Sequence, residues 1–384
     1  MFSNPFSPIF GGKPDVFFGR ERILTMFDYA MVDVGSDDRA LFITGTRGSG
    51  KTALLEQLSI RAEAKKRRVI DLGPEDTISQ LIYTLTGYDE VTKTISPNAS
   101  MSVLGVGAGL SGGSVSKTEH IGKKNLQALL LEACSKCKNG ILVTVDEIQK
   151  VPIDDLSTLC NAFQMASRKG YDIMLAVAGL PYIYSDVIKH EGCTYLRRAS
   201  HEELGLFTWE EASESFDKVF LKINGLSVSR EIVDMLNQAS YGHPYIMQLL
   251  GYHLVLRANE CSSGKKYSVT KDDAKVAIDN ALFAYEQRAL KPLLDEITDG
   301  EVTYLKMMSD CLDSDRLAET SDIARGLGVT QSKLSRQRSK LINYGIIASP
   351  ERGKVMFCIP YLSDYVKKDE FVSDAVSVAR ARRV

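Results

Sequence analysis

The sequence predicts an α/β protein in which a parallel sheet with crossover helices precedes a helical segment and a small C-terminal module. Three observations support this prediction. Short apolar runs alternate with amphipathic helical stretches over residues 16–205, and a helical pattern then extends from about 207 to 290. From about 299, a helix, a short helix, a glycine turn, another helix and a hairpin follow in order. A chain of 384 residues is expected to form two or three domains.

The predicted strands of the first segment are near-continuous apolar runs, as expected when helices cover both faces of a sheet. They are ALFIT (40–44), RVIDL (68–72), ILVTV (141–145) and IMLAV (173–177). Between the second and third strands, residues 102–118 are too rich in glycine for a helix and too apolar for a typical linker. We expect a surface loop there, and a hairpin that touches DNA or a neighbouring subunit is the alternative.

The composition is that of an average globular protein, with 44% hydrophobic and 25% charged residues. A formal net charge of −2 gives no overall attraction to nucleic acid or to a membrane, so any such attraction must be local. Seven cysteines without regular spacing, no export signal and no apolar stretch of about 20 residues favour a cytoplasmic protein with reduced thiols. Residues 1–15 are expected to form an N-terminal arm that lies on the first domain.

A glycine-rich loop follows the first predicted strand and leads into a helical pattern. It fits the phosphate-loop (P-loop) pattern of a glycine, four residues and then Gly-Lys-Ser/Thr. Backbone N–H groups in such a loop converge on phosphates, the lysine adds a charge, and the threonine hydroxyl is placed to ligate Mg²⁺. The loop residues are Gly45, Thr46, Arg47, Gly48, Ser49, Gly50, Lys51 and Thr52.

The third predicted strand ends in two carboxylates, Asp146 and Glu147. Asp146, at the strand tip, is expected to hold the shell of the Mg²⁺ ion. Glu147 is expected to orient and deprotonate the attacking water, as phosphoryl transfer to water requires. An acidic pair after a strand is a weak signal alone, but beside a P-loop it predicts hydrolysis as well as binding of ATP.

The chain resembles the P-loop ATPases of the AAA+ group, and most closely the origin-recognition and archaeal-ATPase type that ends in a winged helix. The residues that carry this resemblance are VFFGRE (16–21), GTRGSGKT (45–52), VDEIQ (145–149) and YLRRASHEELGLFTWEEA (195–212). The resemblance implies that Phe17 lies near the adenine. It also implies that Arg197 or Arg198 reaches into the nucleotide site of a neighbouring copy, and the alternative is that both lie on a solvated face.

The sequence departs from this resemblance in two places. The fourth strand ends in AVAGLP (176–181), where many relatives place a polar residue that touches the γ-phosphate. The helical segment reads YGHPYIMQ (241–248), where relatives often present an arginine. Its Gly-x-Pro resembles the signalling ATPases called STAND, so His243 and Pro244 are candidates for sensing the nucleotide. Pro244 is also explained as the first residue of a helix.

Residues 320–360 fit a winged helix-turn-helix, in which the second helix enters the major groove. Residues 331–384 carry eleven basic and five acidic residues, whereas residues 291–330 carry four basic and nine acidic ones. Positive charge gathered at one end of the module favours duplex binding, and docking of a protein is the alternative. The candidate DNA-binding residues are Lys333, Arg336, Arg338, Lys340 and Arg352.

The sequence therefore predicts an α/β fold with a P-loop NTPase parallel sheet, an α-helical lid and a C-terminal winged helix-turn-helix domain. The expected boundaries are 1–15 for the arm, 16–205 for the ATPase core, 206–290 for the lid and 291–384 for the last domain. The expected function is an ATP- and Mg²⁺-dependent switch that binds double-stranded DNA and assembles as a homo-oligomer through its ATPase face. The alternative is a signalling or defence ATPase whose winged helix docks a protein partner.

Overall fold

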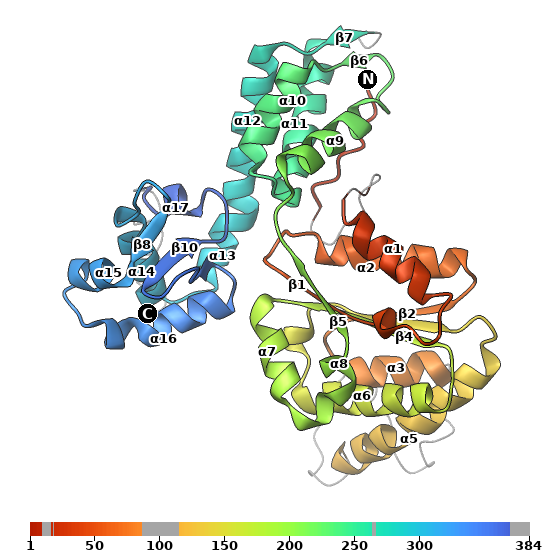
Figure 1. Ribbon diagram of the computed structural model, residues 1–384. Helices are drawn as coiled ribbons and strands as arrows, with labels where there is room; N and C mark the ends of the chain where they lie inside the picture. Colours follow the sequence, from red (N-terminus) through yellow and green to blue (C-terminus); the bar gives the residue numbers. More distant parts are fainter. Residues whose placement is uncertain (10–16, 18, 87–114, 263–265, 369–384) are drawn as a thin grey trace.

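The computed structural model describes residues 1–9, 17, 19–86, 115–262 and 266–368 (Figure 1). A five-stranded parallel sheet with the order β2-β3-β4-β1-β5 forms the centre of the first part of the chain. Its strands are β1 (Ala40–Gly45), β2 (Arg68–Leu72), β3 (Ile141–Val145), β4 (Ile173–Gly179) and β5 (Ser200–Leu204). Since all five strands are parallel, the loops that follow β1, β3 and β4 meet at one edge of the sheet.

Helices cover both faces of this sheet, which makes a three-layer α/β/α core (Figure 1). Alternate residues of β1 supply the two faces, because side chains in a strand point to opposite sides. Leu41 and Ile43 pack with α1 (Glu21–Ala30) and α2 (Lys51–Ala64). Phe42 packs on the other face, in a core with residues of five further helices. These are α3 (Thr77–Thr86), α5 (Val115–Lys136), α6 (Ile153–Arg168), α7 (Pro181–Lys189) and α8 (Thr194–Arg197).

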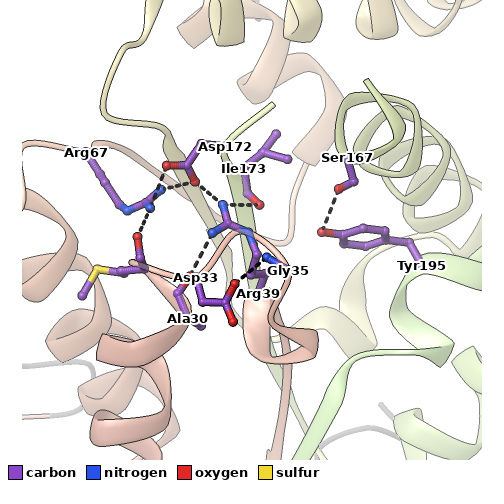
Figure 2. A network of polar contacts seen from close by, with 10 residues as sticks. Ala30, Asp33, Gly35, Arg39, Arg67, Ser167, Asp172, Ile173 and Tyr195 are labelled. Carbon is purple, nitrogen blue, oxygen red and sulfur yellow. Dashed lines mark hydrogen bonds and ion pairs between the residues drawn. The ribbon is translucent and has the colours of Figure 1, made fainter. Parts of the chain in front are cut away.

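An ion-pair network fixes the amino-terminal ends of three strands (Figure 2). Arg39, Arg67 and Asp172 each immediately precede a strand, β1, β2 and β4 respectively. Asp172 accepts hydrogen bonds from Arg39 and, at 2.7 and 2.9 Å, from both terminal nitrogens of Arg67. Both guanidinium groups are buried, and they also donate to the carbonyls of Ala30 and Met31. The network therefore holds the strands in register at the edge opposite the P-loop.

Four helices form the lid above the core: α9 (Trp209–Phe220), α10 (Arg230–Ser240), α11 (Pro244–Cys261) and α12 (Lys271–Tyr285). Two-residue strands β6 (Leu226–Ser227) and β7 (Tyr267–Ser268) pair at its tip. The described part of the N-terminal arm, residues 1–9, lies on this lid and not on the first domain, which corrects the prediction (Figure 1). The reason is hydrophobic packing. Phe2 and Phe6 are buried in the lid core, and the Phe6 ring packs against the rings of Phe216 and Phe220.

A π-helix (Glu286–Leu290) and α13 (Lys291–Asp295) lead from the lid to the C-terminal module. The module contains α14 (Asp299–Asp310), β8 (Leu317–Glu319), α15 (Thr320–Gly326), α16 (Gln331–Asn343), β9 (Ile347–Ala348), β10 (Lys354–Phe357) and α17 (Leu362–Tyr365). Its antiparallel sheet has the order β8-β10-β9. This order of helices and strands is the one expected for a winged helix-turn-helix.

The α/β fold class is confirmed, and the four predicted strands lie where the apolar runs indicate. The strands β5, β6, β7 and β8 are absent from the prediction. The larger part of the glycine-rich stretch, residues 102–114, lies outside the described residues. All seven cysteines are free thiols. In the part of the chain that the structure describes, we find no helix with the length and apolar character of a membrane span.

Candidate nucleotide-binding site

The P-loop connects β1 to α2 at the carboxyl edge of the sheet. Gly48 and Gly50 have φ angles of 77° and 92°, a conformation that residues with a side chain rarely adopt. The Ser49 hydroxyl is buried and has no hydrogen-bond partner among the described residues. A buried polar atom without a partner carries a free-energy cost, so the loop is built to receive a polar ligand.

Lys51 is 6% exposed and lies across the loop. Its Nζ donates to the carbonyl oxygens of Gly45 and Thr46, both at 2.9 Å. Burial lowers the pKa of Lys51, while the carboxylates of Glu147 and Asp146 act in the opposite direction. The ammonium group is thus held beside the loop, where a phosphate would replace the two carbonyls as its partner.

Asp146 and Thr52 face each other across the site. The Thr52 hydroxyl donates to Asp146 Oδ2 at 2.6 Å, and the Glu147 N–H donates to Asp146 Oδ1 at 2.8 Å. A hydroxyl and a carboxylate at this spacing are oxygen ligands of the kind that Mg²⁺ accepts beside nucleotide phosphates. The described residues contain no group of three His, Cys, Asp or Glu that could hold a metal by themselves. The donor set therefore fits a magnesium–nucleotide complex.

Glu147 directly follows Asp146 and has a left-handed backbone with φ 52°. Such a conformation costs a non-glycine residue free energy and turns its side chain away from the strand direction. The carboxylate is half-exposed, accepts a hydrogen bond from Gln149 at 2.6 Å and lies 3.8 Å from the Lys150 ammonium. It is thus available to a water molecule at the mouth of the loop.

These groups line a cleft of about 780 Å³ between the core and the lid. This volume falls in the usual range of small-molecule sites. The loop and the two carboxylates form its polar end, and the opposite end is aromatic and apolar. There Arg20 lies over the Phe207 ring at 4.8 Å from its centre. The cleft residues at this end are Phe6, Ile9, Phe17, Phe207, Phe216 and Met247.

His243 contacts the P-loop, and Pro244 lines the same cleft. His243 is 2% exposed, and its Nε2 lies 3.2 Å from the carbonyl oxygen of Arg47. Since a carbonyl only accepts, Nε2 carries the proton, and Nδ1 has no partner among the described residues. Burial lowers the pKa of His243 to about 4, and the Lys51 charge acts in the same direction. The imidazole is therefore neutral at pH 7.

Arg197 and Arg198 lie far from the P-loop of their own chain. They come just before β5, and Ser200 pairs with Leu41 at the start of β1, whereas the loop follows the end of β1. Both arginines are exposed. Arg197 donates to the carbonyl of His190 at 3.2 Å, and the Arg198 side chain has no partner in the described part of the chain. This placement separates them from the nucleotide site of their own chain.

The C-terminal module sits against the P-loop. Arg47 forms two hydrogen bonds to the Glu296 carboxylate, at 3.0 and 2.6 Å, next to the start of α14. A Cβ built on Gly345, just after α16, would lie 3.4 Å from Thr46 and 3.6 Å from Pro181 of α7. Residues of the module and of the P-loop are therefore in direct contact.

The candidate DNA-binding residues differ in their surroundings. Lys333, Arg336 and Arg352 are exposed, whereas Arg338 is half-buried. Lys340 forms an ion pair with the buried Glu301 at 2.8 Å, so it is engaged inside the module.

The sequence alone does not indicate several of the residues that line the cleft. The N-terminal arm supplies Phe6, Ser7 and Ile9, and the segment before α14 supplies Glu296. The aromatic residues of the arm indicate that it packs against the protein, but they do not indicate that it contacts a ligand. No residue near Glu296 in the sequence indicates a contact with the P-loop.

The five-stranded parallel sheet with helices on both faces is the fold of AAA+-type P-loop proteins. Residues 33–185 match the family described as AAA domain (AAA_22). Residues 287–366 match a domain of unknown function, DUF8462. No curated protein matches the chain.

Solved structures of origin-recognition proteins resemble the whole chain. The Aeropyrum pernix ORC2 protein in ADPNP–ADP complexes is 15% identical, with a TM-score of 0.61 over 98% of this chain and 99% of that chain. Its ADP form is 14% identical, with a TM-score of 0.53 over the same shares. The ORC1 protein of that organism in complex with DNA is 16% identical, with a TM-score of 0.49 over 94% of this chain and 95% of that chain. The chain has the fold of the AAA+ ATPases of the origin-recognition type.

Proposed function

We propose that the chain binds and hydrolyses ATP with Mg²⁺, and that the bound nucleotide controls the attachment of its C-terminal module to double-stranded DNA. One observation carries the first part: Lys51, Thr52, Asp146 and Glu147 surround the polar end of a single cleft. The aromatic end of the same cleft suits a stacked base.

The residues of the cleft have separable roles in this proposal. The N–H groups of the P-loop and the start of α2 bind the phosphates, and Lys51 adds a positive charge. Thr52 and Asp146 would hold Mg²⁺, which when bound neutralises phosphate charge. Glu147 orients a water molecule and accepts its proton as the water attacks the terminal phosphate.

The hydrolysis is tested with Glu147→Gln. Because this variant keeps the size of the side chain and loses the base, ATP should bind with near wild-type affinity while kcat falls by ~10²-fold or more. Glu63→Gln is the matched control, since Glu63 is an exposed carboxylate at the end of α2 outside the cleft. A wild-type protein that releases no phosphate, alone or with DNA, would refute hydrolysis and leave a nucleotide-binding protein.

The DNA part of the proposal depends on α16, where Lys333 and Arg336 are exposed and three residues apart. Residues at this spacing share a helix face. The double variant Lys333→Ala/Arg336→Ala should weaken duplex binding for all sequences. It should also reduce the slope of log affinity against log salt by about one for each lost phosphate contact. Lys138→Ala/Lys169→Ala, two exposed lysines of the core, is the control.

A second function is favoured by the contacts of the P-loop with other parts of the chain. His243 lies on the loop, and Glu296 binds Arg47. Contacts of this kind suit a regulatory ATPase whose nucleotide changes the position of a protein-docking module. Absence of duplex binding at every salt concentration and nucleotide state would reject the DNA proposal in favour of this one.

A further inference from the structure

Gln149 makes two hydrogen bonds that join the catalytic carboxylate to the neighbouring strand. Its Nε2 donates to Glu147 Oε2 at 2.6 Å, and its Oε1 accepts from the Leu180 N–H at 3.1 Å. The amide uses one donor and one acceptor in these contacts, so its orientation is determined by both partners. Leu180 follows β4 directly and caps the start of α7.

The register of the sheet explains why the amide reaches both partners. β3 and β4 are parallel neighbours with Val145 paired to Val177. β4 continues two residues further, to Gly179, whereas β3 ends at Val145 and the chain turns at Glu147, which has a left-handed backbone. Gln149 spans the space between these two chain segments.

Gly179 has no room for a side chain. A Cβ built on it would lie 2.8 Å from Ile148 Cγ1 and 2.9 Å from Gln149 Oε1. Real Cβ atoms do not make such contacts, so a larger residue would displace the amide or the chain. The amide of Gln149, which lies in the 3-10 helix Ile148–Lys150 after β3, therefore lies at the end of β4, where the strand carries no polar side chain.

We propose that Gln149 is the positioning residue for Glu147. The inference rests on the proposed hydrolysis. By donating to Oε2, Gln149 fixes the direction of the carboxylate and leaves Oε1 free to accept from the attacking water. A shift of about 1 Å in such a group is enough to reduce a rate by ~10²-fold.

Two substitutions separate positioning from structural support. Gln149→Glu keeps the length and the acceptor for Leu180 but loses the donor to Glu147. Gln149→Met keeps the length and loses both hydrogen bonds. Positioning predicts that kcat falls in both variants by about 10- to 100-fold, with the KM for ATP unchanged within about twofold. Near wild-type turnover in Gln149→Glu, with a loss confined to Gln149→Met, would overturn the positioning role. The control is Gln164→Glu on α6, which makes the same change outside the cleft.

A second measurement does not depend on turnover. Gln149→Glu places two carboxylates in contact, so its Tm should fall below that of the wild type. Exchanging the pair, Glu147→Gln with Gln149→Glu, restores an amide–carboxylate hydrogen bond and should recover most of the lost Tm. Additive effects of the two substitutions on Tm would overturn the contact.

The outcomes keep the two proposals apart. Wild-type protein without ATPase activity refutes the proposed hydrolysis, and with it the positioning of a catalytic group, while the Tm cycle still decides the contact. Active wild-type protein with unchanged kcat in Gln149→Glu overturns the positioning role and leaves the hydrolysis intact.

Discussion

Acidification should destabilise the protein through His243. This imidazole is buried against the P-loop, and its pKa is about 4 in the folded chain, compared with 6.5 for an ordinary histidine. Between these values the unfolded chain binds more protons than the folded one, so the stability rises with pH and is lost as the pH falls. The groups that face the ring are Lys51, whose charge opposes protonation, and Tyr285, whose ring centre lies 5.9 Å away.

The size of the effect follows from the two pKa values. Their difference corresponds to about 3 kcal/mol of unfolding free energy when the pH passes through both pKa values. Between pH 7 and pH 5 it corresponds to about 2 kcal/mol. Burial also lowers the pKa of His201 and of His253, so these two histidines also make the folded protein less stable as the pH falls. A comparison with a variant is therefore needed to isolate His243.

The assay is urea unfolding of wild type and His243→Gln at several pH values from 5 to 7. Glutamine keeps a donor for the Arg47 carbonyl and does not titrate in this range. The variant should lose about 2 kcal/mol less than wild type on going from pH 7 to pH 5. His253→Gln is the control and should flatten the dependence less, since His253 is only half-buried. Equal pH dependence in wild type and His243→Gln would refute the buried neutral state of His243.

Three further predictions concern separate parts of the chain. Lys51→Ala should abolish binding of a fluorescent ATP analogue while circular dichroism shows an intact fold, and unchanged affinity would remove Lys51 from the site. The Arg198→Ala variant should bind ATP but hydrolyse it poorly. Mixing this variant with Glu147→Gln should restore some turnover, because one of the mixed interfaces has both groups. If no mixing ratio restores turnover, the nucleotide site is complete within one chain. Asp172→Ala leaves two buried guanidinium groups without their shared carboxylate. Urea unfolding should therefore show that the free energy of unfolding falls by about 3–5 kcal/mol. A near wild-type unfolding midpoint would contradict the structural role of the network.

The sequence predicts the central strands well because their burial is uniform. β1, β3 and β4 are buried at every position, and a continuous apolar run indicates such a strand directly. β5 reads SHEEL and buries only Glu202 and Leu204, so its composition resembles a loop. Its place at the edge of the sheet follows from pairing with β1, which is a tertiary contact that no local pattern encodes.

The polar end of the site was predictable for a similar reason. The P-loop and the carboxylate pair are each contiguous in sequence and lie at the ends of predicted strands. The N-terminal arm and Glu296 reach the cleft only through packing of distant segments, since Ser7 binds Gln248 and Glu296 binds Arg47. Gln149 belongs to the stretch VDEIQ (145–149), but its contact with Leu180 depends on the parallel pairing of β3 and β4.

The contact between Arg47 and Glu296 has a thermodynamic consequence. Arg47 belongs to the P-loop and Glu296 to the segment that begins the C-terminal module, so a ligand that reshapes the loop changes the free energy of seating the module. Equilibrium coupling is reciprocal: if a nucleotide changes the affinity of the module for its target by some factor, the target changes the affinity for that nucleotide by the same factor. A target that binds α16 more tightly in one nucleotide state would then favour that state, and the concentration of free target would shift the fraction of chains that carry ATP.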